Sequence, residues 1–336
     1  MEVLNALIVF SNFVLIPTVT YGSQLALGAL GVTLIYGVLR FSNFAHGDTM
    51  AFGTMLVMLL TWGFQSRGIT LGGLPTALLA LPFGILGCAA VLLATDRLVY
   101  RFYREQRVTP VVLVIVSMGV MFIMNGIIRI VIGPDEQTFA DGARFILSVR
   151  DFKNLTGQDE GLALRTTQAL TLITAVVLVA ALFWFLNKTR LGKSMRAFSD
   201  NEDLARLSGI NPQRVVLMTW VIVAVLATVA GTLYGLDKTF KPFTYFQLLL
   251  PTFAAAILGG MGNPLGAIVG GFIIAFSEVT VVYAWKKVLV YLLPEWLEPA
   301  GLMQLVSTDY KFAVSFAILL FVLVFRPTGL FQGKSE

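Results

Sequence analysis

Long apolar stretches alternate with short polar ones along the whole chain of 336 residues. A helix needs about 20 apolar residues to cross a bilayer core ~30 Å thick. Several stretches are shorter than this, so we predict an all-α polytopic membrane protein with eight to ten transmembrane or broken helices. The apolar stretches are residues 4–18, 22–38, 49–62, 73–94, 110–132, 167–185, 215–234, 246–258, 265–284 and 312–325.

The composition supports this class. Hydrophobic residues make up 57% of the chain and charged residues only 13%, whereas soluble domains carry roughly 25% charged residues. Residues 1–5 contain a glutamate and no basic residue, so we expect the first apolar stretch to be retained in the membrane and not cleaved. The single cysteine, Cys88, excludes a disulfide framework, and one cysteine with one histidine cannot form a tetrahedral metal site.

Arginine and lysine side chains predict how the chain is oriented. They gather in residues 95–109 and 188–214, which the positive-inside rule places in the cytoplasm. The more acidic connection 134–166 lies one crossing away from each and is expected outside, and the same count places both termini in the cytoplasm. Lys286 and Lys287 then lie outside, where a helix in the lipid interface beside Trp285 would explain them. The isoelectric point is about 9.3, and the excess of basic residues lies mostly in the two basic connections. The lipid bilayer as a partner is enough to explain it, and no nucleic acid is needed.

The most informative polar break is Phe-Ser-Asn-Phe-Ala-His-Gly-Asp at residues 41–48, which holds the only histidine. Short membrane segments around such a break are typical of a transport path. His46 is either a proton relay or, as we favour, a hydrogen-bonding residue that bridges the break. Asp48 is a candidate cap for a helix that starts at Thr49. The candidate path residues from this stretch are Asn43, His46, Gly47 and Asp48.

A second break separates the stretches 246–258 and 265–284 and supplies Gly259, Gly260 and Asn263 as further candidates. Asn125 and Glu278 lie inside apolar stretches, either as a polar lining or as partners in interhelical hydrogen bonds. Small residues recur every four positions at Gly262, Gly266 and Gly270. We interpret them as a smooth face for close helix packing, in preference to direct contact with solute.

The basic connection 188–214 contains a predicted short amphipathic helix at about 200–209, capped by Ser199 or Asp200. Leu204, Leu207 and Ile210 fall on one face, and Gly209 ends the helix. Such a helix either binds a partner protein or rests on the membrane surface. A nucleotide site is not expected in this connection, because Asn187 stands where a phosphate-binding loop ending in Gly-Lys-Ser needs its first glycine.

The pattern Ala205-x-x-x-Gly209 is similar to the loop by which permeases of ATP-binding-cassette importers contact their ATPases. Four other segments also resemble the family, and all five occur in the same order and at similar spacing. Nearly the whole chain therefore resembles branched-chain amino-acid importer permeases of the LivH type. Permeases of urea importers share much of the pattern. The outer connection 134–166 is longer than the family leads us to expect. The four other segments are residues 43–48, 191–197, 254–267 and 325–331.

The resemblance implies that residues 1–336 form a single permease domain in the bacterial cytoplasmic (inner) membrane. It also implies a LivM-type permease, two cytoplasmic ATPases and a periplasmic amino-acid-binding protein as partners. This chain would then need no cofactor and would not be an enzyme, because the ATPases use the ATP. Its coupling residues would be Asp200, Leu204, Ala205, Leu207, Gly209 and Ile210.

Two alternatives remain at this stage. One is a permease of the same superfamily for urea or another small solute. The other is a proton-coupled secondary transporter, in which His46, Asp48 and Glu278 would be the coupling groups. A membrane-embedded enzyme is disfavoured, because the apolar stretches contain no paired carboxylates and no metal-ligand cluster.

Overall fold

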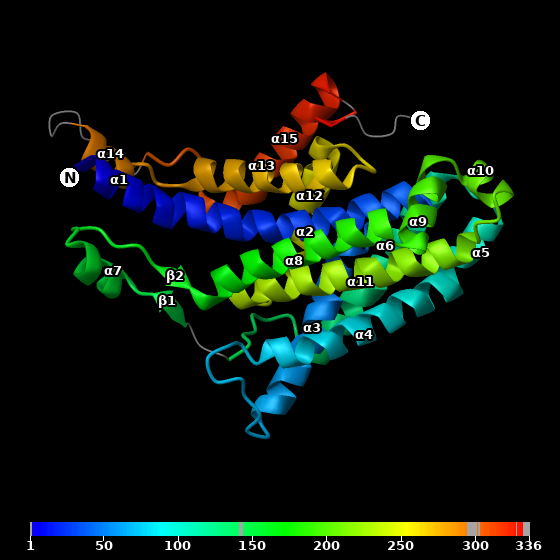
Figure 1. The fold of residues 1–336 in the computed structure, drawn as a ribbon, viewed down its shortest axis with the longest axis horizontal. Coiled ribbons are helices and arrows are strands. Elements are labelled where there is room, and N and C mark those ends of the chain that lie inside the picture. The colour runs from blue at the N-terminus through cyan, green and yellow to red at the C-terminus, as the bar shows by residue number, and fades with distance from the viewer. Residues whose placement is uncertain (1, 141–143, 294–300, 302, 327, 332–336) are drawn as a thin grey trace.

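Helices that run along one common direction make up most of the protein (Figure 1). The computed structural model describes residues 2–140, 144–293, 301, 303–326 and 328–331. Its helices are α1 (Glu2–Phe10), α2 (Ile16–Leu39), α3 (His46–Gln65), α4 (Ala77–Thr95), α5 (Arg101–Glu105), α6 (Pro110–Ile132), α7 (Val149–Thr156), α8 (Thr166–Lys188), α9 (Arg190–Asp200), α10 (Glu202–Leu207), α11 (Pro212–Asp237), α12 (Pro242–Gly259), α13 (Pro264–Val282), α14 (Lys286–Leu292) and α15 (Lys311–Phe325). A short antiparallel pair, β1 (Phe145–Leu147) and β2 (Leu164–Arg165), lies in the connection 134–166.

Seven helical runs in the described part of the chain are long and apolar enough to cross a membrane. The helix α15 is apolar but shorter, and α3 has 20 residues with a more polar first turn. With these two, nine helices are candidates for crossing or entering the bilayer, within the predicted range. The prediction of an all-α polytopic membrane protein is confirmed. The seven runs are Glu2–Leu39, Ala77–Glu105, Pro110–Ile132, Thr166–Lys188, Pro212–Asp237, Pro242–Gly259 and Pro264–Val282.

The first two predicted segments are in fact one continuous helix, which corrects the sequence analysis. A π-helical turn, Ser11–Leu15, joins α1 to α2, and the Ile16 N–H bonds to the carbonyl of Ser11. This wider turn immediately precedes Pro17, which lacks an N–H, so the proline is accommodated without a break. Residues 19–21 contain no further helix breaker and continue α2.

The helix α1 packs against α14 and lies beside the connection 134–166. Ala6 and Val9 of α1 pack against Val288 of α14, and Asn12 accepts a hydrogen bond from the backbone of Ala163 in the connection 134–166. The C-terminal residues instead lie at the turn between α12 and α13, where Leu330 N–H bonds to the carbonyl of Leu258. The prediction that both ends of the chain are cytoplasmic stays a prediction.

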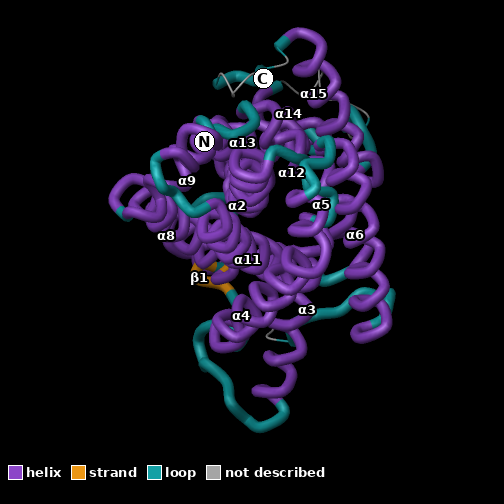
Figure 2. The backbone as a smooth tube through the Cα atoms, turned by 90° about the vertical axis from the view of Figure 1, so that its right-hand side faces the viewer, coloured by secondary structure: helices purple, strands orange, loops and turns teal. Residues whose placement is uncertain are grey.

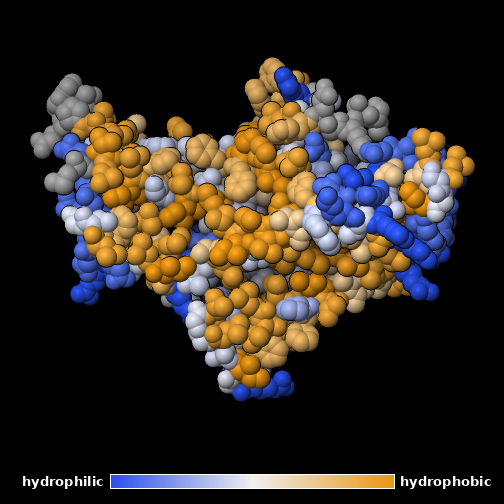
Figure 3. Space-filling model, in the orientation of Figure 1, coloured by the Kyte–Doolittle hydropathy of each residue, from blue (hydrophilic) through white to orange (hydrophobic). Residues whose placement is uncertain are grey.

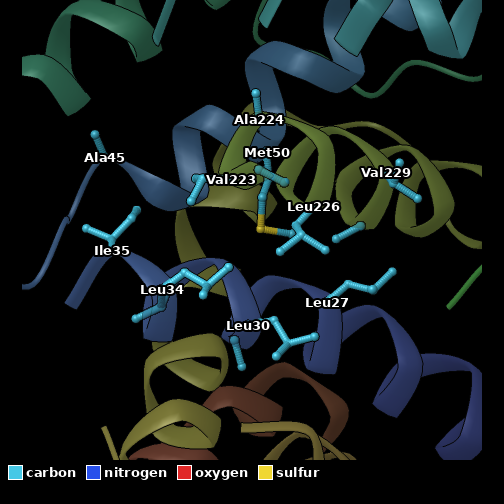
Figure 4. Close-up of a cluster of buried hydrophobic side chains, with 14 of the residues drawn as sticks. Leu27, Leu30, Leu34, Ile35, Ala45, Met50, Val223, Ala224, Leu226 and Val229 are labelled. Carbon is cyan, nitrogen blue, oxygen red and sulfur yellow. The ribbon is translucent and has the colours of Figure 1, made fainter. Parts of the chain in front are cut away.

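The centre of the bundle is α2, which lies between α13 and α11 (Figure 2). It is apolar around its whole circumference and buried along most of its length, as expected for a helix enclosed by others. Figure 4 shows Leu27, Leu30 and Leu34 of α2 facing Leu226 of α11 and Met50 of α3. On the outside, apolar side chains cover the middle of the molecule and polar ones gather at its ends (Figure 3), as a bilayer requires.

The helices α12 and α13 pack with their backbones in close contact. A methyl group on Gly266 would overlap the carbonyl of Gly259, and one on Gly270 would overlap the carbonyl of Ala255. Gly262, which we had placed on the same face, instead lies in the turn before α13 with φ of +85° and open space around it. The reason is that Asn263 and Pro264 start the helix two positions later than the glycine.

We expect Gly266→Ala to lower the apparent midpoint of thermal unfolding of the purified protein and its yield of assembled material. Overpacking of this kind costs about 1–3 kcal/mol. The matched control is Gly63→Ala in α3, where a methyl group meets open space. Its midpoint should stay the same or rise, since an interior helical glycine costs about 0.5–1 kcal/mol relative to alanine. Equal midpoints for the two variants would contradict the close contact.

Candidate functional site

The connection between α2 and α3 turns back into the protein and does not lie in solvent. Arg40 ends α2 in the left-handed conformation, and most of residues 41–45 are buried. The ring of His46, the first residue of α3, fills the space beside Gly31 of α2, where a methyl group would overlap it. Gly31 lies roughly two helical turns before the end of α2, so α3 begins at depth within the bundle.

Side chains from several helices satisfy the backbone of this break. Asn43 Oδ1 accepts bonds from the Ala45 N–H at 3.1 Å and from the Tyr100 hydroxyl at 3.3 Å. The N–H of Phe44 bonds to Ser117 Oγ of α6 at 3.0 Å. Because lipid offers no hydrogen-bond partner, these contacts are what permits an irregular backbone at this depth.

Asn43 provides the side-chain hydrogen bonds that satisfy the backbone of this break. The hydrogen-bonding role that we expected for His46 stays a prediction. The ring lies near the backbone of Gly28 and is held by packing. Asp48 does not cap a helix at Thr49, because α3 already begins at His46.

Asp48 instead lies in the first turn of α3 and links that helix to α6. It is buried and accepts a hydrogen bond from Asn125 Nδ2 at 2.7 Å. The neighbouring Gly47 allows α12 to approach, since a methyl group there would lie 2.7 Å from the carbonyl of Tyr245. The start of α3 is thus enclosed by α2, α6 and α12.

Glu278 belongs to a different cluster. It lies fully buried on α13, accepts a hydrogen bond from Ser315, and has the Lys311 ammonium 3.8 Å away. The same ammonium lies 4.0 Å from the ring centre of Tyr21 on α2. Tyr21 and Gly31 are ten residues apart on α2, about 15 Å, so the structure does not bring Glu278 to the break that holds His46.

The second break, between α12 and α13, is also capped by an asparagine. Gly260 and Gly262 have φ of +105° and +85°, and Asn263 Oδ1 accepts from the N–H groups of Leu265 and Gly266 at 3.1 and 3.2 Å. This turn lies next to the end of α2, where Gly37 approaches Gly262. The two breaks therefore share one means of satisfying the backbone but contact different helices.

Sequence analysis missed a buried polar network around Asp96. Its carboxylate accepts from Arg104 at 2.5 and 3.1 Å and from the indole N–H of Trp220 at 2.8 Å. Trp220 stacks on Tyr100, whose hydroxyl reaches Asn43. One signal was available in the sequence: a single acidic residue ends an apolar stretch and arginines follow it. In a membrane protein such a residue is more often paired with an arginine than free in a loop.

The basic end of the molecule, which we define as residues 97–107 and 188–214, carries the short helix α10. Asn201, and not Ser199 or Asp200, is its N-cap, since Asn201 Oδ1 accepts from the Leu204 N–H at 3.0 Å. Asp200 ends α9 and, with Gly262, lines a cavity of about 390 Å³. Asp200 therefore lies outside α10, and not at the start of the helix that we expected at about 200–209.

The exit from α10 follows the predicted glycine. Gly209 has φ of +81°, and its N–H bonds to Arg206 while the next N–H, of Ile210, bonds to Ala205. Ala205 is buried and Ile210 packs inward. Leu204 and Leu207 point outward and are 61% and 84% exposed.

A groove of about 970 Å³ lies beside this helix. It is bordered by the end of α2, by α5 and by the start of α11, and charged side chains of both signs line it. Arg104 and Arg206 belong to this lining, so the groove reaches both α10 and the Asp96 network. The basic end thus combines an exposed apolar pair with a charged groove.

These features define a multi-pass membrane protein in which α3 begins inside the bundle and exposed leucines lie beside a charged groove at the basic end. Residues 14–323 match the family described as branched-chain amino acid transport system, permease component, and the chain belongs to that family. A permease component of a transport system works with other subunits and has a transport role, in preference to an enzymatic one.

Individual relatives match over nearly their whole length. The high-affinity branched-chain amino acid transport system permease protein LivH of Escherichia coli (strain K12) is 30% identical over 95% of this chain and 94% of its own. The permease protein BraD of Pseudomonas aeruginosa is 28% identical over 96% and 95%. A probable LivH of Methanocaldococcus jannaschii is 28% identical over 81% of each chain.

We expect Asp96→Ala to destabilise the protein by about 1–3 kcal/mol, because it leaves the buried indole N–H of Trp220 without its acceptor and removes the partner of the partly exposed Arg104. Asp96→Asn keeps an acceptor for the Trp220 indole and should lower the stability less than Asp96→Ala does. The control is Glu105→Gln, which removes only an exposed pair with Arg101 and should change the stability by less than about 1 kcal/mol. Thermal unfolding of the three variants in one detergent measures the order, and an Asp96→Ala midpoint equal to that of the control would contradict the role of the network.

Proposed function

We propose that this chain is a permease subunit of an ATP-binding-cassette importer that moves branched-chain amino acids across the bacterial cytoplasmic (inner) membrane. Its partners in this proposal are a LivM-type permease, two cytoplasmic ATPases and a periplasmic amino-acid-binding protein. The relatives with this transport role match from end to end, which supports the proposal. The observation that carries it is the exposed pair Leu204 and Leu207 on α10.

The surroundings of this pair favour a protein partner. Ala205 and Ile210 anchor α10 from below, so its outward face is presented in a fixed orientation. An exposed apolar contact beside a groove lined by charges is the usual composition of a protein interface, with an apolar centre and a polar rim. In the proposal this face enters the ATPase, and the basic end is the cytoplasmic one.

The arrangement of ionisable groups favours ATP as the energy source over a proton gradient. His46 packs against Gly31, Asp48 pairs with Asn125, and Glu278 pairs with Lys311 in a separate cluster. A proton relay requires groups within reach of one another, and His46 and Glu278 are held about 15 Å apart along α2. In the proposal these groups hold helices together.

We expect Leu207→Glu to abolish co-purification of the ATPase while leaving the permease folded. A charge on the apolar centre of an interface must be desolvated without a partner. The matched control is Leu155→Glu on α7, at the opposite end of the molecule, where the leucine is 79% exposed. Retention of the ATPase by both variants, or its loss from both, would contradict docking at α10.

His46→Gln separates the two energy sources. Glutamine keeps a donor and an acceptor but does not ionise near neutral pH. In proteoliposomes supplied with ATP and an ionophore that collapses the proton gradient, the wild type and this variant should both retain most of their uptake. Gly31→Val, which would displace the ring, is the packing control and should lose folding. Loss of wild-type uptake on addition of the ionophore would favour the proton-coupled transporter.

A further inference from the structure

A cavity of about 450 Å³ opens at the end of the molecule opposite the basic end. The start of α8, the end of α11, residues 138–140 and Arg144 contribute to its walls. Its volume falls within the roughly 300–1,000 Å³ that small-molecule sites occupy. Sequence analysis singled out none of the residues that line this cavity, because they come from four separate parts of the chain.

Hydrogen bonds from outside the cavity hold its walls in place. The carbonyls of Thr138 and Phe139 accept from Trp62 Nε1 at 3.1 Å and from Gln65 Nε2 at 3.0 Å, both on α3. Arg144 Nη1 donates to the carbonyl of Leu74 at 2.7 Å. A site whose walls are fixed before a ligand arrives loses little entropy on binding.

The cavity presents both signs of charge from different elements. Arg165 precedes the first turn of α8, where Thr166 and Thr167 add hydroxyls and the helix dipole adds a positive end. Asp237 is the last residue of α11, where the dipole is negative, and its side chain is only 7% exposed. The Lys238 ammonium lies 3.5 Å from that carboxylate and is itself largely exposed.

Phe139 and Leu236 are the large apolar side chains of the lining, which also includes Arg144 as a further cation. A cationic group, an anionic group and an apolar wall in one cavity match the three parts of an aliphatic α-amino acid. Urea has neither a net charge at one end nor an aliphatic side chain, so it would use little of this lining.

We propose that this cavity is a binding site for a zwitterionic aliphatic α-amino acid at the outer end of the permease. Arg165 and the start of α8 receive the carboxylate, Asp237 receives the ammonium, and the side chain lies against Phe139 and Leu236. The assignment of this end as the outer one, and of the amino acid as the solute, rests on the proposed function. The site adds a selecting step within the permease itself, separate from the soluble binding protein.

The test uses the complete membrane complex in nanodiscs with the soluble binding protein left out. Equilibrium binding is measured for leucine, for 4-methylpentanoate, which lacks the ammonium, and for 3-methylbutylamine, which lacks the carboxylate. Wild type should bind leucine at least about tenfold more tightly than either analogue, since each lost charged hydrogen bond is worth about a factor of ten or more.

Two variants assign the charges. Arg165→Gln should weaken the binding of leucine and of 4-methylpentanoate at least about tenfold and leave the binding of 3-methylbutylamine unchanged. Asp237→Asn should weaken the binding of leucine and of 3-methylbutylamine and leave the binding of 4-methylpentanoate unchanged. The control is Arg150→Gln, an exposed arginine on α7 in the same connection but outside the cavity, which should change none of the three. Size-exclusion profiles and basal ATP hydrolysis establish that each variant complex is assembled.

The proposal is overturned if the wild-type complex without the binding protein does not bind leucine, or if Arg165→Gln and Asp237→Asn leave the three affinities unchanged. It is also overturned if Arg165→Gln leaves leucine binding intact but weakens attachment of the soluble binding protein, because the arginine would then meet an acidic residue of that protein. Each result leaves the proposed function standing, since ATP-driven leucine uptake with all subunits present is measured separately. Absence of that uptake in the wild type would instead remove the proposed function.

Discussion

The whole architecture depends on the requirement that no backbone N–H or carbonyl be left unpaired in the hydrocarbon layer. Two interruptions occur, one inside the bundle before α3 and one at the turn before α13, and in both an asparagine side chain takes the place of the missing helical partner. Asn43 also accepts a hydrogen bond from the Tyr100 hydroxyl, which links the start of α3 to the helical turn that follows α4. A third irregularity, at Pro17, is absorbed by a π-helical turn without any change of direction. At the breaks before α3 and before α13 the helices can stop because the backbone groups there keep hydrogen-bond partners.

One line of contacts connects the basic end to the first of these breaks. It runs from Arg104, which lines the groove beside α10, through Asp96 and Trp220 to Tyr100 and then to Asn43. Each member is packed or hydrogen-bonded to the next, so a displacement of the groove has to be accommodated at the start of α3. In an importer driven by partner ATPases, such a connection is how a change at the cytoplasmic surface would reach the membrane interior. Double-mutant cycles along the line are the physical measure of that coupling.

The sequence was sufficient for the fold class and for the position of most helices, because apolar length alone decides them in a membrane protein. It did not predict that residues 4–18 and 22–38 are one helix, since nothing in a hydropathy pattern distinguishes a π-helical turn at a proline from a loop. Gly262 was misplaced for a local reason, namely that Asn263 with Pro264 is the stronger helix start. The Asp96 network and the cavity around Arg165 and Asp237 could not be predicted, because their members meet only through tertiary packing.

Uptake by the reconstituted complex is the most direct test of the central claim that this chain is the ATP-driven path for branched-chain amino acids. The permease, its partner permease, the ATPases and the binding protein are placed in proteoliposomes, and accumulation of leucine, urea and a small polyol is measured with and without ATP. We expect ATP-dependent accumulation of leucine, competed by isoleucine and valine, and no accumulation of urea or the polyol. Accumulation of urea in preference to leucine would contradict the substrate, and accumulation of leucine that does not depend on ATP would contradict the mechanism.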